Sequence, residues 1–182
     1  MALTFTPFAE LGAKCPDFTL PGVDGKNYSL KDFVNDKPLV VMFICAHCPY
    51  VQAIEDRLIT LGRDLKKEGV HLLAICSNDA KDHVEDSFEN LKKRAHEKNY
   101  SFVYLHDDSQ DVAKKFGAVC TPDYFVYDKS LHLAYRGRLD DSWRDAQKVT
   151  QRELYSAVQD LLQDKQITVQ PTASMGCSIK WK

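Results

Sequence analysis

The residues best suited to chemistry are Cys45 and Cys48, which stand three positions apart in the segment Ile-Cys-Ala-His-Cys-Pro-Tyr at residues 44–50. An apolar run over residues 39–44 precedes them, and an amphipathic stretch begins near Pro49. A Cys-x-x-Cys pair at a junction between a strand and a helix is typical of a redox centre. If the helix begins at Cys45, its free N–H groups and its dipole stabilise a thiolate there. We therefore expect Cys45 to be the nucleophile of low pKa and Cys48 to resolve the mixed disulfide.

Zinc binding and simple burial could also account for this pair. Cys45, His47 and Cys48 could supply zinc ligands, with Cys120 as a further one. A structural zinc site usually needs a second closely spaced pair, but the remaining cysteines are scattered singly at Cys15, Cys76, Cys120 and Cys177. Buried cysteines that act only as small apolar side chains seldom need this spacing at a helix start. We predict a redox centre with no metal and no cofactor.

Composition favours one domain without a nucleic-acid or membrane partner. The chain has 182 residues, 44% of them hydrophobic, and a formal charge of −2 with no basic block. These values suit one core of ordinary size and make nucleic-acid and anionic-membrane binding poor expectations. The N-terminal residues lack the pattern of a signal peptide, so a cytoplasmic location is expected. In that compartment the six cysteines need not form a disulfide framework.

The elements that must position the redox centre follow from hydrophobic patterning. Continuous apolar runs predict buried strands, and apolar residues at helical spacing predict amphipathic helices. The expected strands are residues 39–44, 70–76, 101–106, 124–127 and 131–135, and the expected helices are 51–68, 79–99, 109–116 and 150–163. The charged residues of the second helix are expected to face solvent, and Ser109 and the capping box Thr150-x-x-Glu153 mark two helix starts. This order predicts an α/β domain over residues 1–165, with an N-terminal arm or hairpin at 1–36 and a tail at 166–182.

The order of these elements, with Thr121-Pro122 directly before the last two strands, resembles the thioredoxin fold. Pro16-Asp-Phe-Thr-Leu20, Gly25, Leu30 and Asp32 resemble the N-terminal segment of its peroxiredoxin-like branch, the AhpC/TSA proteins and their TlpA and ResA relatives. The resemblance spans about residues 11–164. It implies a central mixed β-sheet with helices on both faces and a cis-proline at Pro122 opposite the redox pair. A cis bond leaves the backbone of Thr121 free to bind an extended substrate segment.

The segment around the two cysteines also resembles particular branches of the superfamily. The tail at residues 174–181 is similar to that of an uncharacterised thioredoxin-family group with Cys-x-His-Cys-Pro centres. His47 stands where strongly oxidising DsbA-type centres carry histidine, so it is expected to tune the redox potential by stabilising the thiolate. Peroxiredoxins carry Thr-x-x-Cys, whereas here Cys45 replaces the threonine, and Cys48-Pro49 resembles the peroxidatic Cys-Pro.

These features predict a thiol-disulfide oxidoreductase that uses Cys45 and Cys48 on protein or small-molecule thiols and disulfides, as a monomer or weak homodimer. The alternative is a peroxiredoxin-like thiol peroxidase acting on peroxide, with Cys48 or Cys45 as the peroxidatic thiol. Arg136 and Arg138 are available to orient a peroxide, although neither matches the family arginine. A third possibility is a redox-inert binding module that uses the groove beside Pro122.

The C-terminal tail is too apolar for a solvated end. Met175, Cys177, Ile179 and Trp181 follow a polar stretch, and such a segment lowers its free energy by docking on the domain. Cys177 can therefore be a structural residue or an additional resolving thiol. Cys120, two positions before the predicted cis-proline, is the other accessory thiol, and its role is left open.

Overall fold

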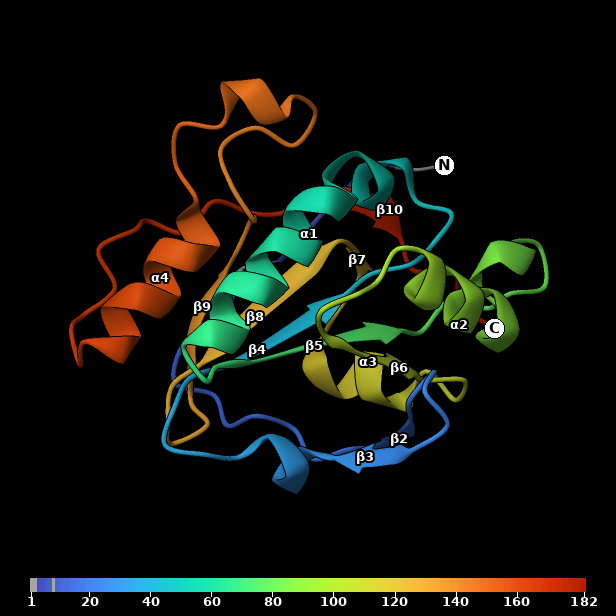
Figure 1. The fold of residues 1–182 in the computed structure, drawn as a ribbon, viewed down its shortest axis with the longest axis horizontal. Helices are drawn as coiled ribbons and strands as arrows, with labels where there is room; N and C mark the ends of the chain where they lie inside the picture. The colour runs from blue at the N-terminus through green and yellow to red at the C-terminus, as the bar shows by residue number, and fades with distance from the viewer. Residues whose placement is uncertain (1–2, 8) are drawn as a thin grey trace.

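The central β-sheet is built around the apolar run that precedes the two cysteines (Figure 1). The computed structural model describes residues 3–7 and 9–182. Five strands lie in the order β6-β5-β4-β8-β9: β4 (Leu39–Phe43), β5 (His71–Cys76), β6 (Val103–His106), β8 (Asp123–Tyr127) and β9 (Leu133–Gly137). β4, β5 and β6 are parallel, whereas β8 runs antiparallel to both β4 and β9. This is the mixed sheet of the thioredoxin fold.

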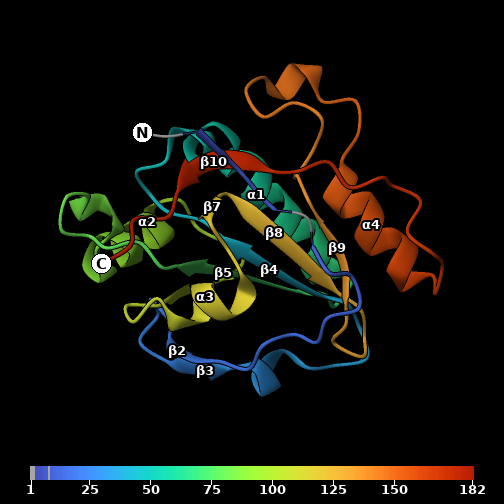
Figure 2. The same cartoon turned by 180° about the vertical axis from the view of Figure 1, so that it is seen from behind.

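Both faces of this sheet are covered, as its continuously apolar strands require. In β4, Val40 and Met42 belong to one hydrophobic cluster, and Val41 and Phe43 belong to another. The first cluster includes apolar residues of α1 (Pro49–Lys67), α2 (Phe88–Glu97) and α4 (Glu153–Leu162), and the second includes those of α3 (Asp111–Phe116) and the N-terminal arm. Figure 2 shows α3 on the face opposite α1. Alternate side chains of one strand therefore hold two helical layers together.

The N-terminal arm forms the predicted hairpin. β2 (Thr19–Pro21) pairs antiparallel with β3 (Asn27–Ser29), and the 3₁₀ helix η1 (Leu30–Phe33) follows. Phe18 and Phe33 are buried with α3 in the second cluster. The arm thus closes the sheet face that α3 covers only in part.

Besides the start of α1, three helix starts differ from the sequence prediction. Residues 79–99 do not form one helix, because the 3₁₀ helix η2 (Val84–Asp86) lies within them and α2 begins at Phe88. α3 begins at Asp111 after Gln110, not at Ser109. α4 begins at Glu153 and follows the 3₁₀ helix η3 (Ala146–Lys148), while the Thr150 hydroxyl bonds Asp141. The start at Thr150 fails because its capping side chain bonds Asp141 instead of the helix.

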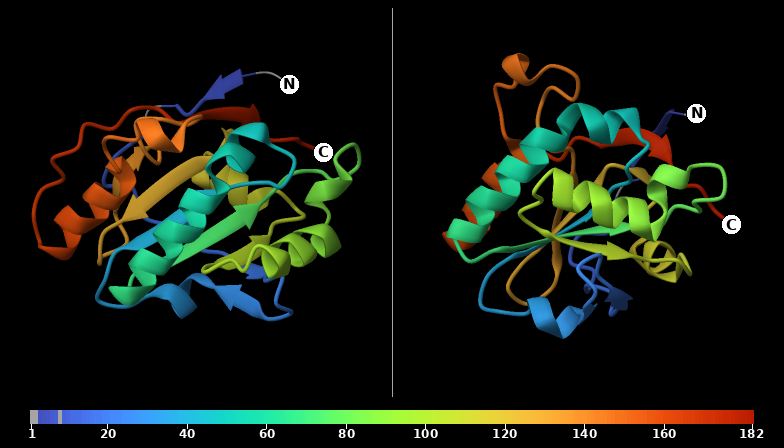
Figure 3. Two further views of the ribbon diagram at one scale, coloured as in Figure 1. Left: turned by 45° about the horizontal axis from the view of Figure 1, so that its top comes forward. Right: turned by 45° about the vertical axis from the view of Figure 1, so that its right-hand side comes forward.

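A second, smaller sheet joins the two ends of the chain. β10 (Met175–Ser178) lies between β1 (Leu3–Phe5) and β7 (Cys120–Thr121), antiparallel to both. Figure 3 shows β1 and β10 together on the side of the molecule away from the β2-β3 hairpin. Within the described residues, no helix is long and apolar enough to cross a membrane.

Candidate active site

Cys48, not Cys45, stands at the start of α1. The helix begins at Pro49, and Cys48 is its N-cap residue. The prediction that the helix opens at Cys45 is therefore wrong. Pro49 carries the sequence signal for the true start, because proline is favoured at the first position of a helix, where its missing N–H is no loss. The free N–H groups and the positive dipole end of α1 consequently act on the second cysteine of the pair.

The Cys48 sulfur lies among several hydrogen-bond partners. The Cys45 thiol, the backbone N–H of Val51, and both the backbone N–H and the thiol of Cys177 donate to it. The Cys45 hydrogen bond is the largest influence, and together these bonds outweigh burial and lower the pKa of Cys48 to about 5. When protonated, Cys48 donates to the carbonyl oxygen of Thr121 at 3.2 Å. The lowered pKa favours the thiolate form of Cys48.

Cys45 has the opposite character. Its side chain is buried, with 1% of the residue exposed, and its sulfur lies 3.2 Å from the hydroxyl of Thr121. Burial, the hydrogen bond to Cys48 and the negative charge of Asp86 raise the pKa of Cys45 well above its ordinary value. The expectation of an exposed Cys45 thiolate is wrong, because the residue precedes the helix instead of beginning it. Cys45 is instead the protonated donor that stabilises its partner.

The three thiols outside the centre have raised pKa values. Burial raises the pKa of Cys15 and of Cys120 to about 12, and it also raises the pKa of Cys76. Cys120 lies in β7, one residue before Thr121, and the negative charge of Asp123 adds to the effect of burial. None of the six cysteines is in a disulfide. Only Cys48 has a lowered pKa among them.

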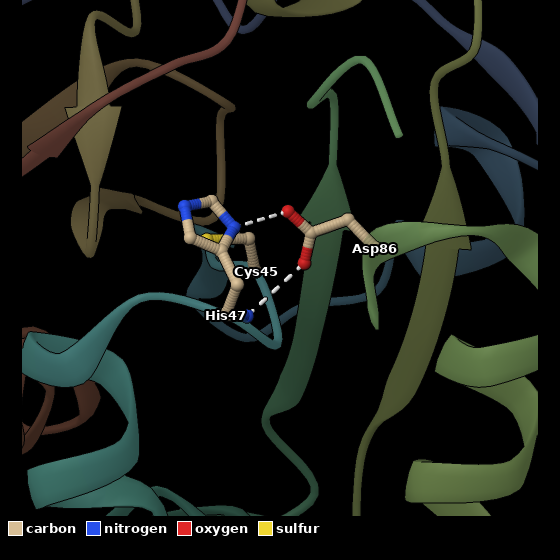
Figure 4. Close-up of side chains that lie close together, drawn as sticks. All are labelled: Cys45, His47 and Asp86. Atoms are coloured by element: carbon tan, nitrogen blue, oxygen red, sulfur yellow. Dashed lines mark hydrogen bonds and ion pairs between the residues drawn. The ribbon is translucent and has the colours of Figure 1, made fainter. Parts of the chain in front are cut away.

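Asp86 organises the loop between the two cysteines. One of its carboxylate oxygens accepts the backbone N–H groups of Ala46 and His47, at 2.7 and 3.2 Å, and the other lies 2.5 Å from His47 Nδ1 (Figure 4). Asn78 donates to the same carboxylate at 2.8 Å. Burial acts to raise the pKa of Asp86, but the bonds from His47 and Asn78 lower it below its ordinary value. Sequence reasoning missed Asp86, because the charged segment that contains it predicts only a solvated helix face.

His47 is held by Asp86 and by a second histidine. Its ring stacks on His83 with 3.8 Å between centroids and 8° between planes. Cys45, His47 and Asp86 are the described residues whose ligand atoms, all within 4.8 Å of one another, could share a metal ion. Both carboxylate oxygens of Asp86 already accept hydrogen bonds from the loop or from Asn78. These bonds satisfy the carboxylate without a metal, and the tuning role of His47 stays a prediction.

The edge beside Pro122 is occupied by the chain's own tail. The Thr121-Pro122 bond is cis, as predicted. Cys177 in β10 pairs with Thr121 in antiparallel register, and the Ser174 hydroxyl donates to the carbonyl oxygen of Pro122 at 2.8 Å. The approach is so close that a Cβ on Gly176 would overlap the carbonyl group of Thr121. The backbone predicted to bind an extended substrate is thus already paired.

The two arginines considered for a peroxide are engaged elsewhere. Arg136 donates to Asp123 at 2.7 Å and to the carbonyl oxygen of Gly117 at 2.8 Å. Arg138 donates to Glu153 at 2.6 Å. Neither guanidinium is directed at the thiols by these bonds. Stabilisation of charge at Cys48 comes instead from backbone N–H groups and neighbouring thiols.

The lowered pKa of Cys48 has a measurable consequence. In the reduced protein, thiolate absorbance in the ultraviolet should rise by one thiolate with a midpoint near pH 5, the value to which the pKa of Cys48 falls. The other thiols stay protonated through this range because their pKa values are raised. Cys45→Ala removes the main donor to Cys48 and should move the midpoint to higher pH. Cys15→Ser, in the opposite cluster, is the control and should leave it unchanged; a midpoint near that of an ordinary thiol in the unaltered protein contradicts the assignment.

The fold defines a thioredoxin-like protein in which Cys45 and Cys48 both contact Thr121, the residue before the cis-proline. The chain belongs to the AhpC/TSA family, whose sequence profile matches residues 11–136. It is 32% identical over 108 residues to peroxiredoxin Bcp of Escherichia coli K12, a match that covers 59% of this chain and 64% of the relative. The match therefore spans less than two thirds of that peroxiredoxin.

Two solved structures are similar over nearly the whole chain. An uncharacterized conserved protein from Geobacillus kaustophilus is 41% identical with a TM-score of 0.95, and the match covers 100% of this chain and 97% of that one. A hypothetical protein from Sinorhizobium meliloti 1021 is 37% identical with a TM-score of 0.94 and 98% of each chain covered. Both matches include the tail that forms β10, but neither description gives an activity.

Proposed function

We propose that the protein is a thiol peroxidase in which the Cys48 thiolate reduces a small hydroperoxide. The observation that carries this proposal is the position of Cys48, the N-cap of α1, where the hydrogen bond from Cys45 and backbone N–H groups lower its pKa to about 5. A thiolate is the form that attacks a peroxide bond. Membership of the AhpC/TSA family and the similarity to a peroxiredoxin support this choice.

The surroundings of Cys48 favour a small substrate. The residue is 0% exposed, and β10 occupies the backbone edge beside Pro122. An extended protein segment can pair with Thr121 only if β10 leaves, whereas a molecule of a few heavy atoms needs only local opening of the structure. Hydrogen peroxide and short alkyl hydroperoxides meet this size requirement.

The proposed reaction uses the two cysteines in the reverse of the expected roles. The Cys48 thiolate attacks one peroxide oxygen, the O–O bond breaks, and the other oxygen leaves as water or an alcohol after taking up a proton. Cys48 becomes a sulfenic acid. The Cys45 thiol then forms a disulfide with Cys48, and the sulfenic hydroxyl leaves as water with the Cys45 proton. A dithiol reductant returns two electrons and restores both thiols.

Thiol-disulfide exchange with a protein is the second candidate function. The Cys-x-x-Cys spacing and the hydrogen bond between Cys45 and Cys48 support it, because such a pair can form and break a disulfide directly. In this case β10 has to be displaced before a substrate binds. The two candidates therefore differ in substrate size and in the need for an open tail.

Both activities can be measured on the same preparation. Peroxide consumption is followed with dithiothreitol as reductant, and disulfide exchange is followed by reduction of insulin under matched conditions. We expect saturable peroxide consumption well above the rate of the reductant alone, with little reduction of insulin. The reverse result, insulin reduction without peroxide consumption, rejects the peroxidase in favour of the oxidoreductase.

A further inference from the structure

Cys177 lies inside the redox centre although it is 129 residues from Cys48 in the printed sequence. Its backbone N–H and its thiol both donate to the Cys48 sulfur. The residue is buried in β10, with 2% exposed, opposite Thr121. Cys48 thus has two neighbouring thiols, Cys45 from its own loop and Cys177 from the tail.

The segment around Cys177 is held in place from both sides. Ile179 N–H donates to the carbonyl oxygen of Val119 at 2.9 Å, and Lys180 N–H donates to Asn78 Oδ1 at 2.9 Å. Asn78 also donates to Asp86, which organises the Cys45–Cys48 loop. On the other side, β1 pairs with β10. These hydrogen bonds and the strand pairing therefore hold the Cys177 sulfur in a fixed position beside Cys48.

We propose that Cys177 is a third redox-active thiol and forms a disulfide with Cys48. The proposal rests on the proposed oxidation of Cys48 by a hydroperoxide. The Cys177 sulfur attacks the sulfenic sulfur of Cys48, the S–S bond forms, and the S–O bond breaks. The hydroxyl leaves as water with the Cys177 proton. A thiol reductant then supplies two electrons, reopens the bond and restores both thiols.

Cys177 competes with Cys45 for the same sulfenic acid. The two thiols resemble each other, since burial and the hydrogen bond to Cys48 raise the pKa of both. For Cys177, the nearby positive charge of Lys180 acts in the opposite direction and favours the thiolate that attacks. A disulfide between Cys48 and Cys177 joins the start of α1 to β10. Oxidation thereby fastens the tail over the edge beside Pro122.

Disulfide mapping tests this pairing directly. The reduced protein is oxidised with one equivalent of hydrogen peroxide, quenched with acid, alkylated and digested with trypsin. Cys45 and Cys48 share the tryptic peptide 32–57, whereas Cys177 lies in 166–180. We expect a cross-link between these peptides in the unaltered protein and in Cys45→Ser. In that variant Cys48 is the only cysteine of peptide 32–57 with which Cys177 can form a disulfide. An internal disulfide in 32–57 with Cys177 free in the unaltered protein overturns the proposal.

The lifetime of the Cys48 sulfenic acid distinguishes a redox role of Cys177 from a purely structural one. In the double variant Cys45→Ser, Cys177→Ser, the sulfenic acid of Cys48 should persist at least about tenfold longer than in Cys45→Ser, as judged by trapping with dimedone. Cys120→Ser, a buried cysteine of the neighbouring strand β7, is the control and should leave that lifetime unchanged in the Cys45→Ser background. Equal lifetimes with and without Cys177 contradict its role.

A second oxidant separates this proposal from the peroxidase proposal. Diamide oxidises neighbouring thiols to disulfides without a peroxide step. If hydrogen peroxide leaves Cys48 reduced while diamide gives the cross-link between 32–57 and 166–180, the peroxidase fails and the Cys48–Cys177 pairing stands. If neither oxidant gives the cross-link, the pairing is overturned whatever the peroxidase assay shows.

Discussion

Cys48→Ser is expected to reduce the rate of peroxide consumption by at least about 10³-fold, because it removes the attacking thiolate. Serine keeps the size of the side chain and its hydrogen-bonding capacity, so the centre should still form. Cys48 is the one thiol whose pKa is lowered, and its position at the N-cap of α1 explains why no neighbour can replace it. The measurement is single-turnover peroxide consumption by the reduced protein without added reductant.

The matched variant Cys45→Ser should behave differently in that assay. It retains a donor to Cys48, and its first turnover is expected to stay within about tenfold of the unaltered protein. Loss of the first turnover in Cys45→Ser, with Cys48→Ser still active, restores Cys45 as the nucleophile and rejects the assignment made from the structure. Cys15→Ser, which lies in the opposite hydrophobic cluster, checks that replacing a buried cysteine is harmless in itself.

Gly176→Ala should destabilise the packing of the tail more than a substitution at an exposed position of the same segment. The added Cβ would overlap the carbonyl oxygen of Thr121 and lie 2.6 Å from its carbonyl carbon. Both are backbone atoms that cannot turn aside, so β10 or β7 has to move. Overpacking of this kind typically costs about 1–3 kcal/mol, and in a chain of this size that lowers the melting temperature by roughly 2–12 °C.

The same variant should expose the redox centre. With β10 displaced, the Cys177 hydrogen bonds to Cys48 weaken, and alkylation of Cys48 by iodoacetamide at about pH 7 should become at least about tenfold faster. Ala173→Val, which enlarges an exposed side chain of the tail outside β10, is the control and should change neither value much. Unchanged stability and unchanged alkylation in Gly176→Ala contradict the close approach of β10 to Thr121.

The opposite directions of the pKa shifts at Cys45 and Cys48 depend on a difference of three residues in where α1 begins. The Cys-x-x-Cys spacing predicts a redox pair, but it does not indicate which of the two sulfurs is the thiolate. Pro49 is the cue that distinguishes them, because proline favours the first helical position and Cys48 is then the N-cap. The sequence contained this cue, which favours Cys48 over Cys45 as the thiolate.

The sequence by itself determined the fold class and singled out Cys45 and Cys48 as the candidate redox pair. Continuous apolar runs predicted the central strands, helical spacing predicted α1, and the resemblance to the thioredoxin fold implied the cis bond at Pro122. These features are local, because periodicity and short motifs record which face of an element is buried and where a turn occurs. These features can therefore be predicted without knowing which distant parts of the chain come into contact.

Only the tertiary structure decided what surrounds Cys48. Asp86 comes from a segment predicted to be a solvated helix, and Cys177 comes from the far end of the chain, yet Asp86 orders the Cys45–Cys48 loop and Cys177 donates to Cys48. The apolar character of the tail indicated that it packs somewhere, but not where. That location depends on backbone pairing between β10 and β7 and on the lack of a side chain at Gly176. The pairing of β10 with β7 cannot be predicted from hydrophobic periodicity, because each strand is too short to have a recognisable pattern. The fit between the two strands exists only in the folded chain.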